Sequence, residues 1–362
     1  MKLTYQNANE LFNQSKMNEL AGSEDGTRFL LLRSLSRSDI LRRLAEKCGY
    51  DLQKTSAREL LPKLYQNSIS ILKIKSFIKS EYNLERKNRL VTEPQLIHEL
   101  YQIKEFDWGG LHQNNLEKNI VDNYVKKISD YNRICQAIDE KLFPSLRSYT
   151  LCSWYNHWTS IIIEDVISDH KDVIPAIGKI KQIDFFLRDV PYDLKVTRFP
   201  EEYIALRRKE MQLRPELTLL KQMCRQYSLS ISQEMSSSRL LEDLWKKISD
   251  HPSRDAQKLI KELADFRMQQ LRLAINDPLP LIKWYYENQG ERRFDASNRL
   301  FLILVDSRDF FNSWQLKRAK DMIRRKVHSS LSKIANHGGK KIVFPWNGSL
   351  YSAISDVIFV VK

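Results

Sequence analysis

The spacing of apolar residues predicts helices over most of the N-terminal half and over a long central stretch. Residues 36–146 have mostly helical periodicity, as in SRSDILRRLAEKCGY, where Ile and Leu recur at helical intervals before a glycine stop. Residues 151–168 are predicted to form one longer helix, and residues 201–289 return to helical spacing. The Asp-Trp-Gly-Gly segment at residues 107–110 is expected to be a loop between helices.

Short segments rich in Ile, Phe, Tyr and Val interrupt the helical pattern. After Pro175 and Gly178 come KIKQIDFFL and PYDLKVTRF, joined by a polar connection at residues 188–189, a pattern typical of a β-hairpin. Farther along, RLFLILVD has the pattern of a buried strand, residues 313–335 that of a long basic helix, and KIVFPW and ISDVIFVV those of strands. This order predicts an α/β fold, in which helices flank a mixed β-sheet.

Composition favours a polyanionic partner. The 362 residues include 59 Lys and Arg against 45 Asp and Glu, a formal net charge of +14. Basic residues bind phosphates with release of counterions, so nucleic acid is the commonest partner, although an acidic protein or an anionic membrane surface fits the same balance. The N-terminal segment lacks a signal-peptide pattern, and no run approaches about 18 apolar residues. We therefore expect a cytoplasmic protein without a membrane association.

The second strand of the predicted hairpin carries an acid and an amine. Because side chains alternate along a strand, Asp193 and Lys195 point to one face and their apolar neighbours to the other. The hairpin can bring Asp184 of the first strand close to Asp193. Two neighbouring carboxylates repel each other unless a cation lies between them, and Mg²⁺ suits one or two carboxylates with waters and phosphate oxygens.

The helix before the hairpin offers a further acid. His157, Ser160 and Glu164 lie at i, i+3 and i+7, on one stripe of this helix, so Glu164 can face the same site as Asp184. A surface acid on an amphipathic helix is the alternative interpretation of Glu164, and a solvated strand face is the alternative for an isolated Asp-x-Lys. His157 is expected to be structural.

Taken together, these residues resemble the active site of the PD-(D/E)xK nuclease superfamily, the fold of many type II restriction endonucleases and of related repair and mobile-element nucleases. Ile183 stands where the family frequently has proline. The matching residues are Glu164 on a helix, Asp184 on a strand, and Asp193 and Lys195 on the next strand.

The resemblance implies a restriction-endonuclease-like core formed by residues 148–200 and 297–362. A helical N-terminal region, residues 1–147, and a helical insertion, residues 201–296, lie outside the resemblance and are expected to contact DNA or a second subunit. The four cysteines lack C-x-x-C spacing, so neither a zinc site nor a disulfide scaffold is indicated.

The resemblance also implies metal-dependent phosphodiester hydrolysis. Asp184, Asp193 and the backbone carbonyl of Leu194 would hold Mg²⁺, for which Mn²⁺ is a possible substitute, and Glu164 would add a ligand or support a second ion. The metal would lower the pKa of a bound water and offset charge on the phosphate, while Lys195 would position that water or assist its deprotonation.

Basic residues outside this constellation are candidates for holding the nucleic acid. One group follows the second hairpin strand and the other belongs to the predicted basic helix, where an ordinary solvated face is the alternative. The candidate nucleic-acid-binding residues are Arg207, Arg208, Lys209, Lys317, Lys320 and Arg324.

The leading hypothesis is a Mg²⁺-dependent DNA endonuclease of a restriction or phage-defence system. Because cutting both strands needs two active sites, a homodimer is expected, and a partner methyltransferase or defence protein is possible. One alternative is a non-catalytic DNA-binding or assembly protein with a nuclease-like fold. Another is a nuclease that acts on RNA or branched DNA, since no RNA-recognition motif distinguishes these substrates.

Overall fold

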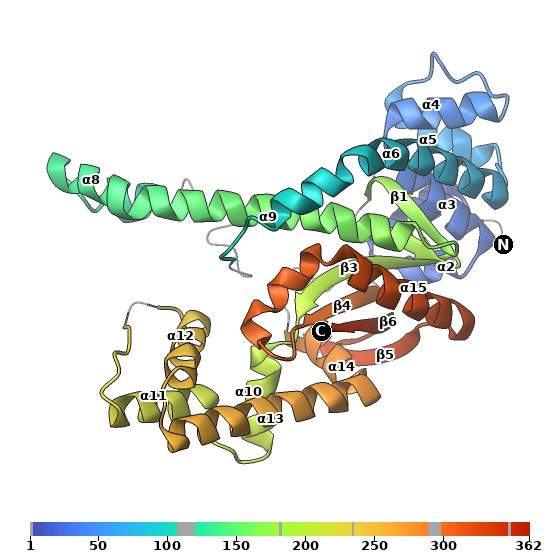
Figure 1. Cartoon of the computed structure of the whole chain (residues 1–362). Helices are drawn as coiled ribbons and strands as arrows, with labels where there is room; N and C mark the ends of the chain where they lie inside the picture. Colours follow the sequence, from blue (N-terminus) through green and yellow to red (C-terminus); the bar gives the residue numbers. More distant parts are fainter. Residues whose placement is uncertain (1–2, 107–119, 181–182, 234, 289–297, 347–348) are drawn as a thin grey trace.

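The protein has a mixed α/β architecture, as predicted (Figure 1). The computed structural model describes residues 3–106, 120–180, 183–233, 235–288, 298–346 and 349–362. The loop expected at residues 107–110 lies outside these ranges. Within them, one six-stranded sheet has the order β1-β2-β3-β4-β6-β5. Its strands are β1 (Val173–Ile180), β2 (Ile183–Leu187), β3 (Val190–Arg198), β4 (Arg299–Val305), β5 (Lys340–Trp346) and β6 (Ser349–Val361).

Strand β3 changes its hydrogen-bonded neighbour partway along its length. Residues 190–192 pair antiparallel with β2, ending at the Phe185–Tyr192 pair. From Asp193 onward the same strand pairs in parallel with β4, beginning at Arg299. Strand β4 in turn runs parallel to β6, and β5 is antiparallel to β6. Asp193 therefore lies where β3 passes from a local hairpin to a strand that is distant in sequence.

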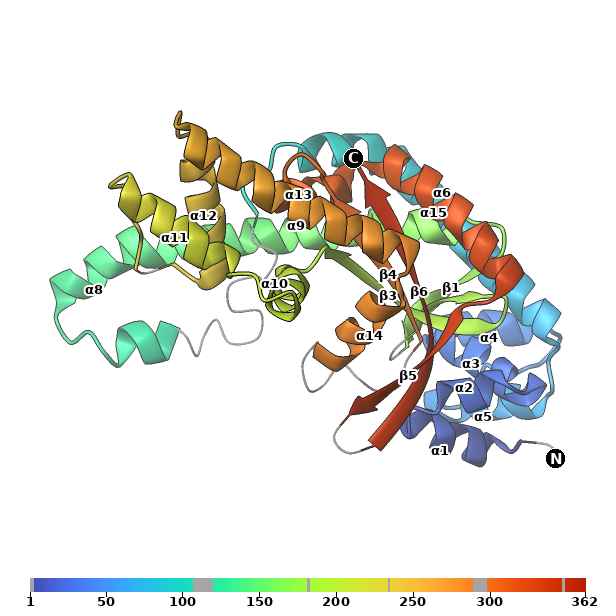
Figure 2. The same ribbon diagram turned by 90° about the horizontal axis from the view of Figure 1, so that it is seen from below.

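Helices cover both faces of the central strands, which is why every residue of β4 is buried. Leu300, Leu302 and Leu304 pack against α9 (Phe143–Ser168) and α15 (Lys320–His337) on one face. Phe301 and Ile303 pack on the other face against helices of the central stretch (Figure 2). The helices that pack there are α10 (Glu201–Glu210), α13 (Arg254–Asn276) and α14 (Leu279–Asn288), whereas α11 (Glu216–Gln226) and α12 (Ser237–Ser249) form a separate apolar cluster with part of α13. The helical character predicted for residues 201–289 is confirmed for the residues described.

The N-terminal helices form an apolar core that is continuous with the edge of the sheet. Ile174 and Phe186, from β1 and β2, are buried within this core. Its helices are α1 (Tyr5–Asn13), α2 (Met17–Ala21), α3 (Glu24–Leu35), α4 (Ser38–Lys47), α5 (Ala57–Gln66) and α6 (Ile71–Leu100). Among the described residues, no helix combines the length and apolarity needed to cross a bilayer.

Helix α9 (Phe143–Ser168) is longer than the helix predicted at residues 151–168. Pro144 lies in its first turn, where the missing N–H has no intrahelical partner to lose, so this proline does not end the helix. Three shorter segments precede α9 and project with it from the body of the protein (Figure 1). They are η1 (Val121–Val125), α8 (Tyr131–Ala137) and η2 (Ile138–Leu142).

Strand β1 corrects the prediction of a single strand over KIKQIDFFL. Residues 179–180 end β1, and β2 begins only at Ile183. Pro175 and Gly178 do not precede the first strand but lie within β1, an edge strand with an irregular register between Pro175 and Ile180. Edge strands tolerate proline because one side of the backbone needs no ladder partner.

The long basic helix predicted at residues 313–335 is two segments. A 3-10 helix, η3 (Phe310–Arg318), is followed at Ala319 by α15 (Lys320–His337). The Asp309 side chain accepts hydrogen bonds from the first N–H groups of η3, and Trp314 is buried. The apolar side chains of η3 therefore pack into the protein. The basic residues of η3 do not lie on the same helix face as those of α15.

Candidate active site

The β2–β3 hairpin brings Asp184 beside β3. Arg188 and Asp189 both have positive φ, 48° and 74°, as a two-residue turn with the twist of a hairpin requires. Continuing the observed register by one pair places Asp184 opposite Asp193. Asp184 Oδ2 accepts a hydrogen bond of 2.7 Å from the Leu194 N–H. The predicted hairpin and its position are confirmed.

Asp193 lies between two cations. Lys195 Nζ donates to Asp193 Oδ1 at 2.8 Å, and Arg299 Nε lies 3.3 Å from Asp193 Oδ2. Arg299 is not among the residues predicted from the sequence. The signal that could have identified it is a charged residue at the start of RLFLILVD, because a long cation in a fully buried strand needs an acidic partner.

Glu164 extends from α9 toward the same acids. The pKa of Glu164 is raised to about 7, mainly by burial and to a lesser extent by the negative charges of Asp184 and Asp165, against the opposing effect of Arg89. The side chain keeps solvent-exposed surface, so it lies at the rim of the site, with protein on its remaining sides. Glu164 and Asp184 therefore interact through the repulsion between their charges, and not through a direct contact.

Asp184 has a similar environment. Burial is the largest effect and raises its pKa; the Leu194 N–H lowers it, the charge of Asp193 raises it, and Lys195 lowers it. The Asp184 side chain, like Glu164, is exposed on one side. A group of acids whose charges disfavour one another, open to solvent, is a suitable environment for a cation.

The donor atoms fit a hard divalent ion. Asp184 and Asp193 offer carboxylate oxygens, and the Leu194 carbonyl faces the β2 side because the N–H and C=O of one strand residue point to the same edge. Among the described residues, no three acidic, His or Cys side chains converge into a preformed metal site. Two carboxylates and a carbonyl are donors of the kind that suits Mg²⁺ with waters and phosphate oxygens rather than zinc.

A buried ionic network holds α9 against α6. Arg86 lies 2.8 Å from Glu93 and 3.1 Å from Asp169. Arg89 donates to both carboxylate oxygens of Asp165, at 2.7 and 2.9 Å. Because Asp165 directly follows Glu164, this network fixes the part of α9 that presents Glu164 to the site.

The basic residues of α10 differ in exposure. Lys209 is exposed, and Arg207 is half-buried, with its Nε donating to Gln270 Oε1 at 3.3 Å. Arg208 is buried and donates to the Arg214 carbonyl at 2.8 Å. The expectation of a solvent-facing basic cluster is therefore corrected for Arg208, whose guanidinium is used inside the protein.

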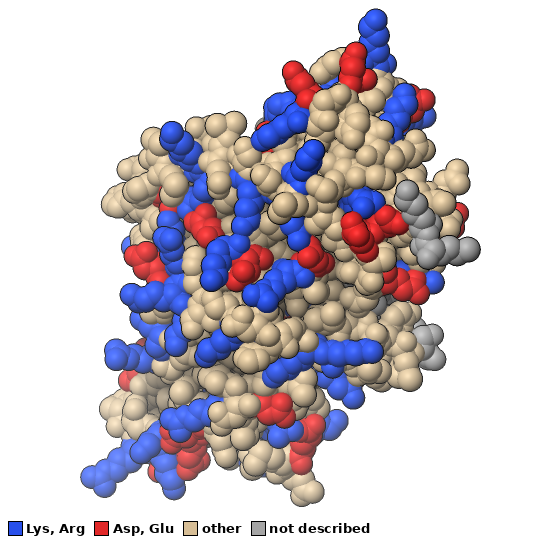
Figure 3. Space-filling model, turned by 90° about the vertical axis from the view of Figure 1, so that its right-hand side faces the viewer, with Lys and Arg blue, Asp and Glu red and all other residues tan. Residues whose placement is uncertain are grey.

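The basic residues of η3 and α15 also differ in exposure. Lys317 is buried, donates to Asn156 Oδ1 at 2.6 Å and lies over the Phe106 ring, which corrects its assignment to an exposed face. Lys320 pairs with Glu93, whereas Arg324 is exposed. Figure 3 shows the side of the molecule on which α15 lies, where basic side chains are more widespread than acidic ones.

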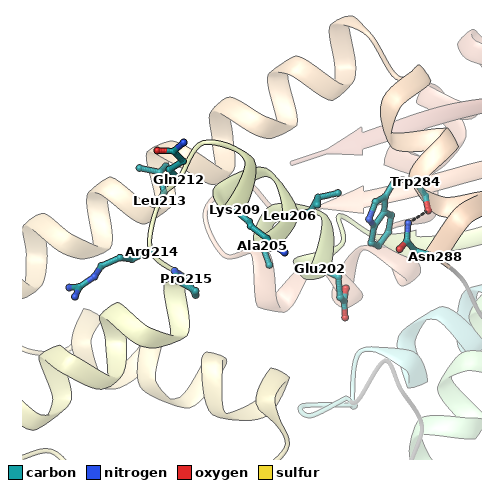
Figure 4. A pocket seen from close by; sticks show the side chains of 10 residues that line it. All are labelled: Glu202, Ala205, Leu206, Lys209, Gln212, Leu213, Arg214, Pro215, Trp284 and Asn288. Carbon is teal, nitrogen blue, oxygen red and sulfur yellow. Dashed lines mark hydrogen bonds between the residues drawn. The ribbon is translucent and has the colours of Figure 1, made fainter.

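A cavity of about 680 Å³ lies along α10, and Asp184, Asp193 and Glu164 are not among the residues that line it. Figure 4 shows Glu202, Leu206 and Lys209 along one face of α10, with Trp284 at one end and Arg214 at the other. The lining is mainly apolar and belongs to the central helices. We therefore identify the candidate active site by the convergence of Asp184, Asp193 and Lys195 on the open sheet, and not by this cavity.

The chain matches no family model, no curated protein and no solved structure.

Proposed function

We propose that the protein is a cytoplasmic, Mg²⁺-dependent DNA endonuclease with a restriction-endonuclease-like core, acting in a restriction or phage-defence system. The observation that carries this proposal is the juxtaposition of Asp184 on β2 with Asp193 and Lys195 on β3. Glu164 on the preceding helix, within electrostatic reach of Asp184, supports it. The net charge of +14 favours a nucleic-acid substrate.

In this proposal each residue has a distinct role. Asp184, Asp193 and the Leu194 carbonyl bind Mg²⁺, and Glu164 supports the site from its rim. When bound, Mg²⁺ makes its water more acidic and offsets the charge of the phosphate under attack. Lys195, which is 36% exposed, exchanges its contact with Asp193 for the attacking water and holds that water in line with the phosphorus.

In this proposal, cations of α10 and α15 hold the phosphate backbone. Lys209 and Arg324 are exposed, and Arg207 and Lys320 are partly exposed beside acidic or amide partners. Two active sites are needed to cut both strands, so the active form is a homodimer. Sedimentation of the DNA-bound protein as a single-chain complex that nonetheless makes double-strand breaks in one binding event would contradict the dimer.

The proposal is tested by incubating the protein with supercoiled plasmid, linear and branched DNA, and RNA, with Mg²⁺ or with EDTA. We expect DNA cleavage with Mg²⁺ only, and its loss in Asp193→Ala and Lys195→Ala proteins that remain folded. Asp243→Ala is a matched control, because Asp243 and Lys247 on α12 form an Asp–Lys pair at 2.7 Å, close to the 2.8 Å of Asp193 and Lys195. This variant should cleave like the wild type.

Other outcomes identify the alternatives. Binding of DNA without cleavage, unaffected by either substitution at the site, would leave a non-catalytic DNA-binding or assembly protein. Metal-dependent cleavage of RNA or of branched DNA in preference to the plasmid would keep the chemistry and change the substrate.

A further inference from the structure

Arg299 is the second cation that contacts Asp193, and it belongs to a strand of the sheet. It is the first residue of β4 and pairs directly with Asp193 in the parallel register. Its side chain is 2% exposed, and its Nε lies 3.3 Å from Asp193 Oδ2. Lys195 contacts the other oxygen of the same carboxylate. Both oxygens of Asp193 therefore have a positively charged neighbour.

Three elements hold Arg299 in this position. Its guanidinium carbon lies 5.1 Å from the centre of the Tyr286 ring on α14, within the range of a cation–π contact. Its backbone carbonyl accepts a hydrogen bond of 2.8 Å from Ser355 Oγ on β6. The residue is thus fixed by β3, β6 and α14, and its guanidinium has no route to solvent comparable with that of Lys195.

The two cations differ in exposure. Lys195 is 36% exposed and can leave Asp193 to contact a water or a phosphate. Arg299 stays in place when Lys195 moves, so Asp193 keeps a counter-charge and a fixed orientation throughout. A fixed positive charge beside a metal ligand also repels a divalent cation, and near a protein surface this repulsion is stronger than in bulk water.

Resting on the function proposed above, we propose that Arg299 is a positioning residue that orients Asp193 and, through its charge, keeps metal affinity low in the free protein. The phosphates of the substrate supply the negative charge that offsets Arg299. Metal and nucleic acid then bind together, because Mg²⁺ commonly takes its ligands from one or two carboxylates and from substrate phosphates. Free protein holds little metal and gains it with the substrate.

The test measures Mn²⁺ binding to the free protein by electron paramagnetic resonance, alongside DNA cleavage at saturating metal. Arg299→Met retains much of the apolar volume and removes the charge. We expect about tenfold tighter Mn²⁺ binding without DNA, because a repelling charge has gone. We expect cleavage to be slower by about 10- to 100-fold, because the orientation of Asp193 is lost. A residue with a merely structural role would weaken or leave unchanged the Mn²⁺ affinity.

Arg267→Met is the matched control. Arg267 is 1% exposed and pairs with Glu216 on other helices at 2.6 Å, so it reports the general cost of removing a buried arginine. The Mn²⁺ affinity of the Arg267→Met protein should equal that of the wild type. Arg299→Lys keeps the charge and loses the planar fork; it should retain weak Mn²⁺ binding and cleave slowly, and it serves if Arg299→Met does not fold.

The outcomes separate this inference from the proposed function. Specific Mn²⁺ binding by the wild type that is lost in Asp184→Ala, with equal or weaker binding by Arg299→Met, would overturn the role of Arg299 alone. Full cleavage by Arg299→Lys would overturn its positioning role. Failure of the wild type and of both Arg299 variants to bind Mn²⁺ would overturn the metal site itself, and with it the proposed function.

Discussion

At the residue scale, burial separates basic side chains that are equivalent in the sequence. Lys317 and Arg324 belong to one basic run, KRAKDMIRRK, yet one is buried against Asn156 and Phe106 and the other is exposed. The difference arises because η3 ends before α15 begins and turns Lys317 inward. Burial lowers the pKa of Lys317 to about 8, so this side chain affects stability and not the nucleic-acid surface.

Burial of Lys317 makes the free energy of unfolding depend on pH in the alkaline range. Its pKa is lower in the folded protein than the ordinary lysine value of 10.5, so between pH 8 and 10.5 the unfolded state binds more protons and stability rises with pH. Relative to Lys317→Met, the unfolding free energy of the wild type should rise by up to about 3 kcal/mol across this window. Urea unfolding at several pH values checks this.

Lys326→Met, at an exposed position of α15, is the control for the lysine experiment and should track the wild type at each pH. Parallel curves for the wild type and Lys317→Met over the same window would mean that Lys317 keeps an ordinary pKa in the folded protein.

At the element scale, the α6–α9 ionic network and the contact between α3 and β1 determine how the N-terminal helices meet the sheet. Arg86 contacts Glu93, Asp165 and Asp169, all largely buried. Gly178 on β1 passes so close to the end of α3 that an added Cβ would lie 1.9 Å from Ser36 Oγ and 2.8 Å from the Leu35 carbonyl. Each feature leads to a stability prediction.

Replacing Arg86 by Met should destabilise the fold by about 3–5 kcal/mol, because three buried acids lose their shared cation. Arg43→Met is the comparison: Arg43 is 50% exposed and pairs with Glu81 across the surface, so its loss should cost less than about 1 kcal/mol. Equal losses in chemical denaturation of the two variants would contradict a structural role for the network.

Gly178→Ala should destabilise the protein by about 1–3 kcal/mol, since α3 and β1 must move apart to admit the methyl group. The control is Gly22→Ala, whose added Cβ would lie 3.4 Å from its nearest neighbours in ordinary backbone conformation. Thermal unfolding of both variants distinguishes a close-packing cost from a general effect of alanine, and an unchanged melting temperature for Gly178→Ala would refute the close approach.

Sequence patterns were informative for elements whose structure is decided locally. The β2–β3 hairpin follows from two apolar segments and a two-residue polar turn, and β4 from a continuous apolar run buried on both faces. Strand β1 was missed because Pro175 looks like a break unless its strand is known to lie at an edge. The Asp193–Arg299 contact could not be predicted, since it depends on a parallel pairing between segments far apart in sequence.

At the scale of the whole molecule, the excess of positive charge is spread over a surface, and its effect should be read from salt dependence. If the protein binds DNA through phosphates, affinity should fall steeply between 50 and 200 mM salt, by an amount set by the number of contacts. Arg324→Ala should lower the slope of log K against log salt by about 1. Fluorescence anisotropy with duplex DNA at several salt concentrations measures it.

Lys258, a 77% exposed residue of α13 that lies outside the proposed nucleic-acid surface, is the control position for the salt experiment, and Lys258→Ala should leave the slope unchanged. A slope for Arg324→Ala identical to that of the wild type would remove α15 from the nucleic-acid surface.

Strand β3 pairs with β2 along its first residues and with β4 along the rest, and the two pairings form at different times during synthesis. The hairpin that carries Asp184, Asp193 and Lys195 leaves the ribosome about 100 residues before Arg299, and pairing of such distant segments is slow compared with hairpin formation. A nascent or truncated chain that stops before β4 therefore carries the acids and the lysine without the strand that orients them. If the protein is the endonuclease proposed above, its hydrolytic capacity would arise only once translation has passed β4, and incomplete chains would pose little threat to the DNA of the cell that makes them.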